Sequence, residues 1–274
     1  MKNKIAIMYD FDDTLIKGCI QEYEMFKNLG VSSPNDFWNE CNSISRLYNM
    51  DMMLGAMYFF VLKAKEKNIN LTKEFLNAQG KNVEYFPGVL TWFDRINEFG
   101  KEHNMEVEHY IISAGVKEIL DGIEIKDKFK KIFASEYIYD KNGTAIWPSQ
   151  IVNFTTKTQY IARIRKGCLD DLFDTKQVNA KVKNYKKLLP YANMIYLGDG
   201  YTDVPCMNMV KAKGGTSISV YKDYDENSKA QAFKLYKDKR VNAYCPADYS
   251  ENSELDKLVK SIILSAKEKL LKEK

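Results

Sequence analysis

The hydrophobic and polar positions along the chain follow two patterns, short apolar runs and longer segments of helical spacing. Ile5–Tyr9 is a continuous apolar run, which is typical of a strand buried on both faces of a parallel sheet. Asn142 and Gly143 form a strong turn signal between two strand-like segments and predict a hairpin. Strands are predicted at 5–9, 108–115, 132–139, 144–147, 194–200, 216–221 and 241–245, and helices at 89–99 and 155–164. Because strands alternate with helices, the pattern predicts an α/β fold with an open parallel, Rossmann-like sheet.

The block from Lys17 to Tyr85 has helical spacing and little strand signal. Since it follows the first strand directly, it is predicted to be a helical cap inserted into the core. The predicted domains are a discontinuous core of residues 1–16 and 86–274 and a cap of residues 17–85. The last segment, 253–271, is amphipathic and begins with a capping-box pattern of Ser253 and Asp256. It is predicted to dock on the core rather than on a membrane surface.

Composition and charge exclude several classes of function. The net charge of +4 is small and the lysines alternate with acids, so no nucleic-acid partner is expected. Two histidines, His103 and His109, are too few and too isolated for a zinc site. The five cysteines form no C-x-x-C pair and are odd in number, which indicates reduced thiols in a cytosolic protein. The sequence has no signal peptide and no apolar stretch of transmembrane length, so it predicts a cytoplasmic protein without a membrane partner.

Polar side chains follow three of the predicted strands at their carboxyl ends. Asp10, Asp12 and Asp13 come after the first strand, Ser113 ends the second, and an aspartate pair follows the strand at 194. In open α/β sheets the site lies beyond the carboxyl ends of the strands, so these residues are expected to converge. Carboxylates without histidine or thiolate suit a hard cation such as Mg²⁺. They also suit a carboxylate nucleophile for phosphoryl transfer.

In these residues the chain resembles a known family, the haloacid dehalogenase (HAD) superfamily. D-F-D-D-T at Asp10–Thr14 is similar to its first motif, D-x-D-x-T after a hydrophobic strand. Ser113 in "YIISAG" matches the second motif, and Asp199 and Asp203 in "YLGDGYTD" match the fourth. The third motif is a single lysine, which we place at Lys157. The order of the pieces, the cap position and the hairpin are most similar to the phosphoserine-phosphatase-like branch, over roughly residues 5–221.

The resemblance implies a role for each matching residue. Asp10 would be the nucleophile that forms an aspartyl-phosphate, and Asp12 the general acid and base. Ser113 and Lys157 would hold the phosphoryl oxygens. Mg²⁺ would be bound by Asp10, Asp12 through its backbone carbonyl, Asp199 and Asp203.

Some of these residues have simpler interpretations. Asp13 occupies a variable place in the motif, so a surface or capping role is favoured. Asp203 precedes Val204-Pro205 and could also cap a helix. Lys166 and Lys176 compete with Lys157 for the third motif. Thr155 and Thr156 look like helix caps, which would place Lys157 in a first helical turn. The helix dipole disfavours a cation there, so the lysine indicates a local anion.

The predicted function is therefore a magnesium-dependent phosphatase that acts on a small phosphomonoester. A phosphotransferase or phosphomutase remains open, because water and another alcohol compete for one intermediate. The rival from a different class is a non-catalytic phospho-acceptor switch, but such receivers carry no helical cap.

Residues that select the substrate are expected in the cap. Glu22 lies near the expected position of a substrate-binding glutamate, and Arg46 is the only arginine between residues 17 and 85. Met53, Met57 and Phe60 have helical spacing and would form an apolar wall if they face the site. The alternative is that these three residues only pack inside the cap.

Overall fold

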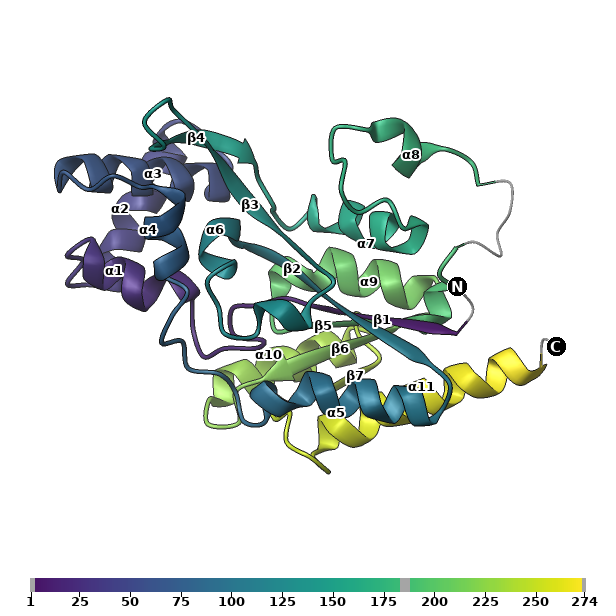
Figure 1. Cartoon of the computed structure of the whole chain (residues 1–274). Coiled ribbons are helices and arrows are strands. Elements are labelled where there is room, and N and C mark those ends of the chain that lie inside the picture. Colours follow the sequence, from purple (N-terminus) through teal and green to yellow (C-terminus); the bar gives the residue numbers. More distant parts are fainter. Residues whose placement is uncertain (1–2, 183–187, 273–274) are drawn as a thin grey trace.

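The computed structural model describes residues 3–182 and 188–272, and its centre is a seven-stranded sheet (Figure 1). The strand order is β4-β3-β2-β1-β5-β6-β7, and every neighbouring pair is parallel except the β3–β4 hairpin. The strands are β1 (Lys4–Tyr9), β2 (Glu106–Val116), β3 (Lys131–Tyr139), β4 (Ala145–Gln150), β5 (Met194–Gly198), β6 (Thr216–Tyr221) and β7 (Ala243–Pro246). This architecture confirms the α/β fold class and the hairpin that the sequence predicts.

The helices alternate with the strands in the core and gather without strands in the cap. The helices are α1 (Glu24–Asn28), α2 (Pro34–Leu47), α3 (Met52–Glu66), α4 (Lys73–Ala78), α5 (Val89–Glu102), α6 (Lys117–Leu120), α7 (Lys157–Lys166), α8 (Thr175–Asn179), α9 (Val204–Ala212), α10 (Glu226–Lys237) and α11 (Glu254–Lys272). Short 3-10 turns are η1 (Ile20–Glu22), η2 (Lys126–Lys128), η4 (Tyr191–Asn193) and η5 (Tyr201–Asp203).

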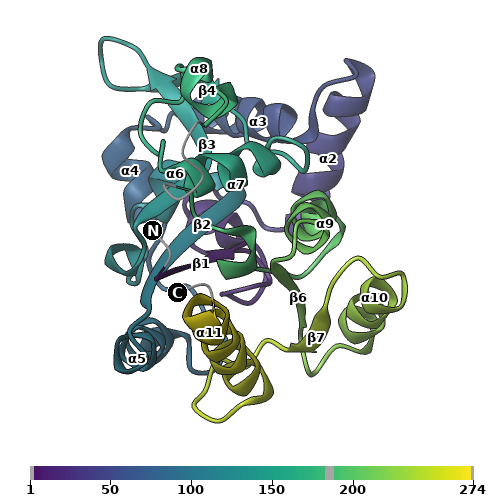
Figure 2. The same cartoon turned by 90° about the vertical axis from the view of Figure 1, so that its right-hand side faces the viewer.

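Helices cover both faces of the sheet, so β1 is buried on both sides (Figure 2). Ile7 packs in one apolar cluster with Trp92 of α5 and Val259 of α11. Met8 points to the opposite face and belongs to a second cluster, with helices α7 and α9. Successive residues of a strand point to opposite faces, which explains why the apolar run in β1 is continuous rather than alternating.

The position of β1 fixes where the site can form. The chain runs outward from β1 to β2 and β3 on one side, and β5, β6 and β7 extend the sheet on the other. The boundary between β1 and β5 is therefore a topological switch point, where open α/β sheets leave a crevice beyond the carboxyl ends of the strands.

The cap consists of α1 to α4, which lie together at one end of the molecule (Figure 1). Its two connections to the core run side by side: Ile16 and Tyr85 form an antiparallel bridge, and the Lys17 N–H donates to the Glu84 carbonyl at 2.8 Å. The predicted cap boundaries, at residues 17 and 85, lie next to this bridge. The division into a core domain and a cap domain stays a prediction.

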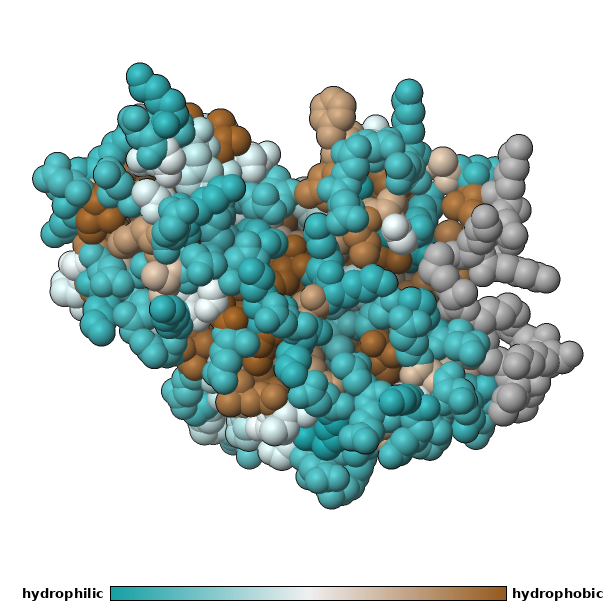
Figure 3. All heavy atoms as spheres, viewed as in Figure 1, coloured by the Kyte–Doolittle hydropathy of each residue, from teal (hydrophilic) through white to brown (hydrophobic). Residues whose placement is uncertain are grey.

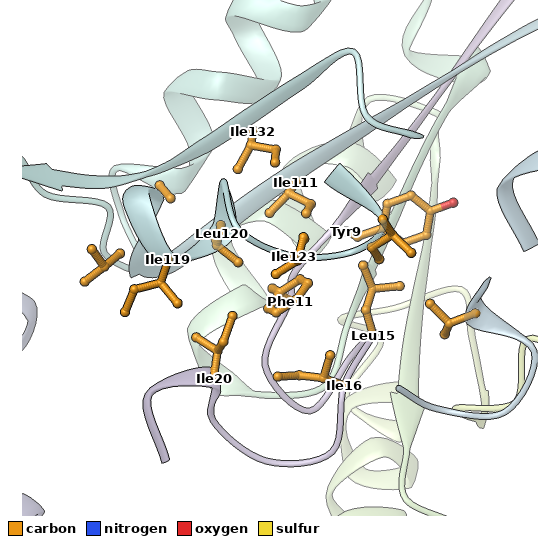
Figure 4. Packing of buried hydrophobic residues seen from close by; sticks show 14 of the residues in the cluster. Tyr9, Phe11, Leu15, Ile16, Ile20, Ile111, Ile119, Leu120, Ile123 and Ile132 are labelled. Carbon is orange, nitrogen blue, oxygen red and sulfur yellow. The ribbon is translucent and has the colours of Figure 1, made fainter. Parts of the chain in front are cut away.

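The segment after β1 is held down by apolar contacts (Figure 4). Phe11, Leu15 and Ile16 have no exposed surface and pack in one cluster with Ile119 and Leu120 of α6. Phe11 thus points into the core between two aspartates. This packing keeps a short acidic loop in place at the end of the strand.

The C-terminal helix docks on the core, as predicted. Leu255, Val259 and Ile263 of α11 have no exposed surface. Ser253 Oγ accepts a hydrogen bond from the Asp256 N–H at 3.1 Å, which is half of the predicted capping box. The other half differs, because the Asp256 carboxylate accepts from the Asn252 N–H at 3.0 Å.

The state of the thiols and the polarity of the surface agree with what the composition predicts. All five cysteines are free, and Cys41, Cys206 and Cys245 are buried. The face in Figure 3 is mostly hydrophilic, with hydrophobic residues in separate small groups. Within the described ranges, none of the helices combines the length and apolar character that a membrane span needs.

A buried chain of hydrogen bonds ties β1 to α5 and β2. The Trp92 indole donates to the Tyr9 hydroxyl at 2.8 Å, and that hydroxyl lies 2.9 Å from His109 Nδ1. His109 Nε2 lies 3.1 Å from Asn97 Oδ1. Burial lowers the pKa of His109 to about 3, so the ring is neutral, accepts at Nδ1 and donates to Asn97.

We expect Tyr9→Phe to lower the free energy of unfolding by about 3 kcal/mol, because it leaves the Trp92 N–H and His109 Nδ1 without a partner at a cost of about 1–3 kcal/mol each. Urea denaturation measures the change. Tyr48→Phe is the matched control, since Tyr48 is exposed. Equal stability of the Tyr9 variant and the wild type would show that the chain of hydrogen bonds contributes nothing.

Candidate active site

Acidic residues follow the two strands that meet at the switch point. In the parallel registers Tyr9 pairs with Ile111 of β2 and with Leu197 of β5. Asp10 is the next residue after Tyr9, and its N–H donates to the Leu197 carbonyl at 2.9 Å. Ser113 lies two residues after Ile111, and Asp199 lies two residues after Leu197. The structure therefore brings the ends of β1, β2 and β5 together, as the sequence predicts.

A buried lysine joins two of the aspartates. Lys157 Nζ lies 2.9 Å from Asp10 Oδ1 and 2.8 Å from Asp203 Oδ1. Lys157 is 1% exposed and Asp203 has no exposed surface. Burial opposes the charge on Lys157, but the Asp10 and Asp203 carboxylates outweigh it and hold the pKa of the lysine above its ordinary value. Lys157 is therefore a fixed positive charge, and the local anion predicted from its helical position is present.

Lys157 is the first residue of α7, and the start of this helix is capped by a residue other than the two threonines predicted from the sequence. The N-cap residue Thr156 makes no side-chain capping hydrogen bond. Asn153 Oδ1 instead accepts from the N–H groups of Thr155 and Thr156 at 3.1 and 2.9 Å. The Asn153 amide donates in turn to Asp51 of the cap at 2.9 Å. An asparagine four residues before a helix start is an Asx-turn signal that could have been found in the sequence.

Asp203 occupies the N-cap position of α9, but its side chain does not cap the helix, so the alternative interpretation holds for its position only. No side-chain capping bond is present at this helix start. The Asp203 carboxylate points inward, where Oδ1 also accepts from the Tyr196 hydroxyl at 2.7 Å. Its position requires a glycine in β5, because a Cβ on Gly198 would lie 2.4 Å from Asp203 Oδ2. Asp203 Oδ2 is buried and has no hydrogen-bond partner among the described residues.

Three aspartates form a cluster that suits a metal ion. One carboxylate oxygen each from Asp10, Asp199 and Asp203 lies within 4.8 Å of the others. Burial and the Asp203 charge raise the pKa of Asp199 to about 7 and that of Asp10 well above its usual range. Three carboxylates and the single ammonium group of Lys157 leave two net negative charges when all are ionised. An all-oxygen donor set, two uncompensated charges and a buried oxygen without a partner fit a divalent cation such as Mg²⁺.

Asp12 lies at the first turn of the loop after β1 and is half-buried. Its Oδ1 accepts from the Ile20 N–H at 2.9 Å. Burial raises the pKa of Asp12 to about 6, even though the Ile20 hydrogen bond favours the ionised form. A carboxyl group with this pKa can both donate and accept a proton near neutral pH.

Asp13 has a structural role in the same loop. Its backbone φ is 51°, and its Oδ1 accepts from the Gly18 N–H at 2.7 Å. Its Oδ2 pairs with Lys222 at 3.2 Å. The expected surface or capping role agrees with these contacts.

Ser113 lies in an irregular stretch of β2, between Ile112 and Val116, where the register with β3 shifts. Its side chain is 1% exposed, and its Oγ accepts from the Gly115 N–H at 3.0 Å. The hydroxyl proton is left to donate to another oxygen.

Two of the three apolar residues predicted to form a wall are packed inside the cap. Met57 and Phe60 of α3 have no exposed surface. The Phe60 ring stacks on Phe37 with centroids 5.2 Å apart and lies 6.3 Å from Phe26, and Met53 packs against the same cluster. For Met57 and Phe60 these contacts agree with the alternative of packing inside the cap, where α3 meets α2 and α1. Met53 is half-buried, and its role stays a prediction.

The two charged cap residues have different surroundings. Arg46 is exposed on α2, and no contact joins it to the aspartates among the described residues. Glu22 is exposed near the start of the cap, and its carboxylate accepts from the Trp38 indole at 2.7 Å.

Comparisons with known proteins bear on the fold. No protein-family model matches the chain. A protein of Borreliella burgdorferi is 27% identical over 93% of this chain and 94% of its own length, and it is uncharacterised.

Among solved structures, a HAD family hydrolase from Salmonella enterica serovar Typhi superposes with a TM-score of 0.60 and 18% identity, over 95% of this chain and 71% of that one. A phosphoserine phosphatase, as an analogue of its phospho-aspartyl intermediate, gives a TM-score of 0.54 and 15% identity, over 94% and 99% of the two chains. The chain therefore has the fold of the HAD hydrolases, with a Rossmann-like core and a helical cap. At the level of the fold, this confirms the resemblance predicted from the motifs.

Proposed function

We propose that this chain, with the HAD hydrolase fold, is a magnesium-dependent phosphatase that hydrolyses a small phosphomonoester through an aspartyl-phosphate on Asp10. The observation that carries the proposal is the buried group of Asp10, Lys157 and Asp203 at the switch point of the sheet. The fold shared with solved phosphoserine phosphatases supports the same reaction class. The free thiols support a cytoplasmic setting.

The first half of the proposed reaction transfers the phosphoryl group to the protein. A carboxylate oxygen of Asp10 attacks phosphorus in line, and the bond from phosphorus to the ester oxygen breaks. Asp12 donates its proton to the departing alcohol oxygen. Lys157 and the Ser113 hydroxyl hold the phosphoryl oxygens, and the lysine balances the charge that develops on them.

The second half returns Asp10 to its starting state. Asp12, now ionised, accepts a proton from a water molecule that attacks the phosphorus of the aspartyl-phosphate. The bond between phosphorus and Asp10 breaks, and inorganic phosphate leaves. The raised pKa of Asp12 supports this double use, since one group must be an acid in one step and a base in the next.

Asp10, Asp199 and Asp203, with the backbone carbonyl of Asp12, would hold the Mg²⁺ ion. When bound, the ion would supply positive charge next to the transferring phosphoryl group. The orphaned Oδ2 of Asp203 and the raised pKa values of Asp10 and Asp199 support a site built for a cation.

EDTA should abolish phosphatase activity, and Mg²⁺ should restore it more fully than Ca²⁺. Calcium has a larger and looser coordination shell than the compact octahedron of magnesium, so it disturbs an in-line geometry. Hydrolysis of p-nitrophenyl phosphate measures this effect. A second measurement does not depend on turnover: Mg²⁺ at 100 times its Kd should stabilise the folded protein by about 2.7 kcal/mol. Full activity in metal-free buffer would contradict the proposal.

A further inference from the structure

The segment that leads into the cap lies directly against Asp12. The Ile20 N–H, at the start of η1, donates to Asp12 Oδ1 at 2.9 Å. The residues on either side of Ile20 are Cys19, which is half-buried, and Gln21, which is 3% exposed. Asp12 protonates the departing alcohol in the proposed reaction, so these neighbours lie beside the group that meets the leaving oxygen.

The side-chain amide of Gln21 is oriented by Cys19. The Cys19 thiol donates to Gln21 Oε1. With Oε1 engaged, Nε2 points the other way. Within residues 3–182 and 188–272, this nitrogen donates to no acceptor.

Gly115 shows what Nε2 faces. A Cβ on Gly115 would lie 3.2 Å from Ser113 Oγ and 3.6 Å from Gln21 Nε2. Both donors therefore lie beside the Gly115 backbone, where a side chain would crowd the Ser113 hydroxyl. Ser113 is a proposed phosphoryl ligand, and Gln21 is the residue after Ile20, whose N–H donates to Asp12.

We propose that Gln21 is a specificity-determining residue whose Nε2 donates a hydrogen bond to an oxygen of the leaving group. The substrate class is then a phosphomonoester whose alcohol carries a hydroxyl or another oxygen acceptor on the carbon next to the ester carbon. This inference rests on the proposed phosphatase function. It places selectivity at the base of the cap, in contrast to Met57 and Phe60 of α3, which are buried in cap packing.

A matched pair of esters tests the proposal. Propyl phosphate and glycerol 1-phosphate have the same carbon chain, but only the second carries hydroxyl groups. The wild type should prefer glycerol 1-phosphate in kcat/KM by roughly 10- to 100-fold, the range expected for one hydrogen bond in a buried site. Gln21→Leu, which keeps the approximate volume without donors, should remove this preference and leave the hydrolysis of propyl phosphate unchanged.

Two variants of Cys19 separate positioning from packing. Cys19→Ala leaves the Gln21 amide free to rotate and should reduce the preference for glycerol 1-phosphate. Cys19→Ser retains a donor to Oε1 and should keep the preference. Equal losses on both esters in Gln21→Leu, or an unchanged preference, would overturn the role of Gln21. Failure of the wild type to hydrolyse either ester would instead overturn the proposed function.

Discussion

Asp10→Asn should reduce turnover by at least about 10⁴-fold while the protein stays folded. An amide is a poor nucleophile toward phosphorus and a weaker metal ligand than a carboxylate, so the variant loses the group on which the intermediate forms. The fold should survive, because asparagine has the same shape and removes a carboxylate whose ionisation burial opposes. Steady-state hydrolysis of p-nitrophenyl phosphate and the melting temperature measure the two effects.

Asp13→Asn is the control for this variant. Asp13 belongs to the same acidic loop, and an asparagine there keeps an oxygen that can accept from the Gly18 N–H. Its turnover should stay close to that of the wild type. Near wild-type hydrolysis by Asp10→Asn would refute the aspartyl-phosphate mechanism.

Asp12→Asn should slow turnover by roughly 10²–10⁴-fold, the usual contribution of a positioned general acid or base. The loss should depend on the step that is observed. p-Nitrophenolate leaves with little need for a proton, so the variant should still release about one equivalent in a burst. The steady phase that follows should be slow, because no base activates the water that attacks the intermediate.

Stopped-flow absorbance separates these two phases. A variant that retained most of its steady rate would assign the proton transfer to another group. A variant without a burst, but with an intact melting temperature, would show that Asp12 is needed to place the substrate rather than to move a proton.

The core and its acids could be predicted from sequence because both depend on local patterns. A continuous apolar run, as in β1, fits a strand that is buried on both faces, and parallel pairing then sets the acids at a common edge. A local anion beside Lys157 was expected from its helical position, and Asp10 and Asp203 are the anions that the structure shows there. For these residues, the position in a strand or a helix was enough to predict which groups surround the side chain.

The cap residues could not be predicted in the same way. α3 is apolar around most of its circumference, so its spacing does not say which side meets α2 and which side meets the core. Phe60 is buried because Phe37, on another helix, supplies a ring for it to stack on. Gln21 was not predicted, because its orientation comes from Cys19 and its surroundings from Gly115 and Ser113, and no periodic pattern contains these contacts.

The central place of β1 has a consequence for how the molecule is assembled. β1 precedes the other strands in the chain, yet its hydrogen-bond partners are β2, about 100 residues later, and β5, about 190 residues later. During synthesis its two edges, and the apolar side chains on both of its faces, stay without their native neighbours until those segments have been made. At rates of about 5–20 residues per second, that interval lasts on the order of 10 seconds or more. Asp10, the proposed nucleophile, directly follows β1. β1 is therefore the strand whose edges stay open to non-native pairing for the longest time during synthesis.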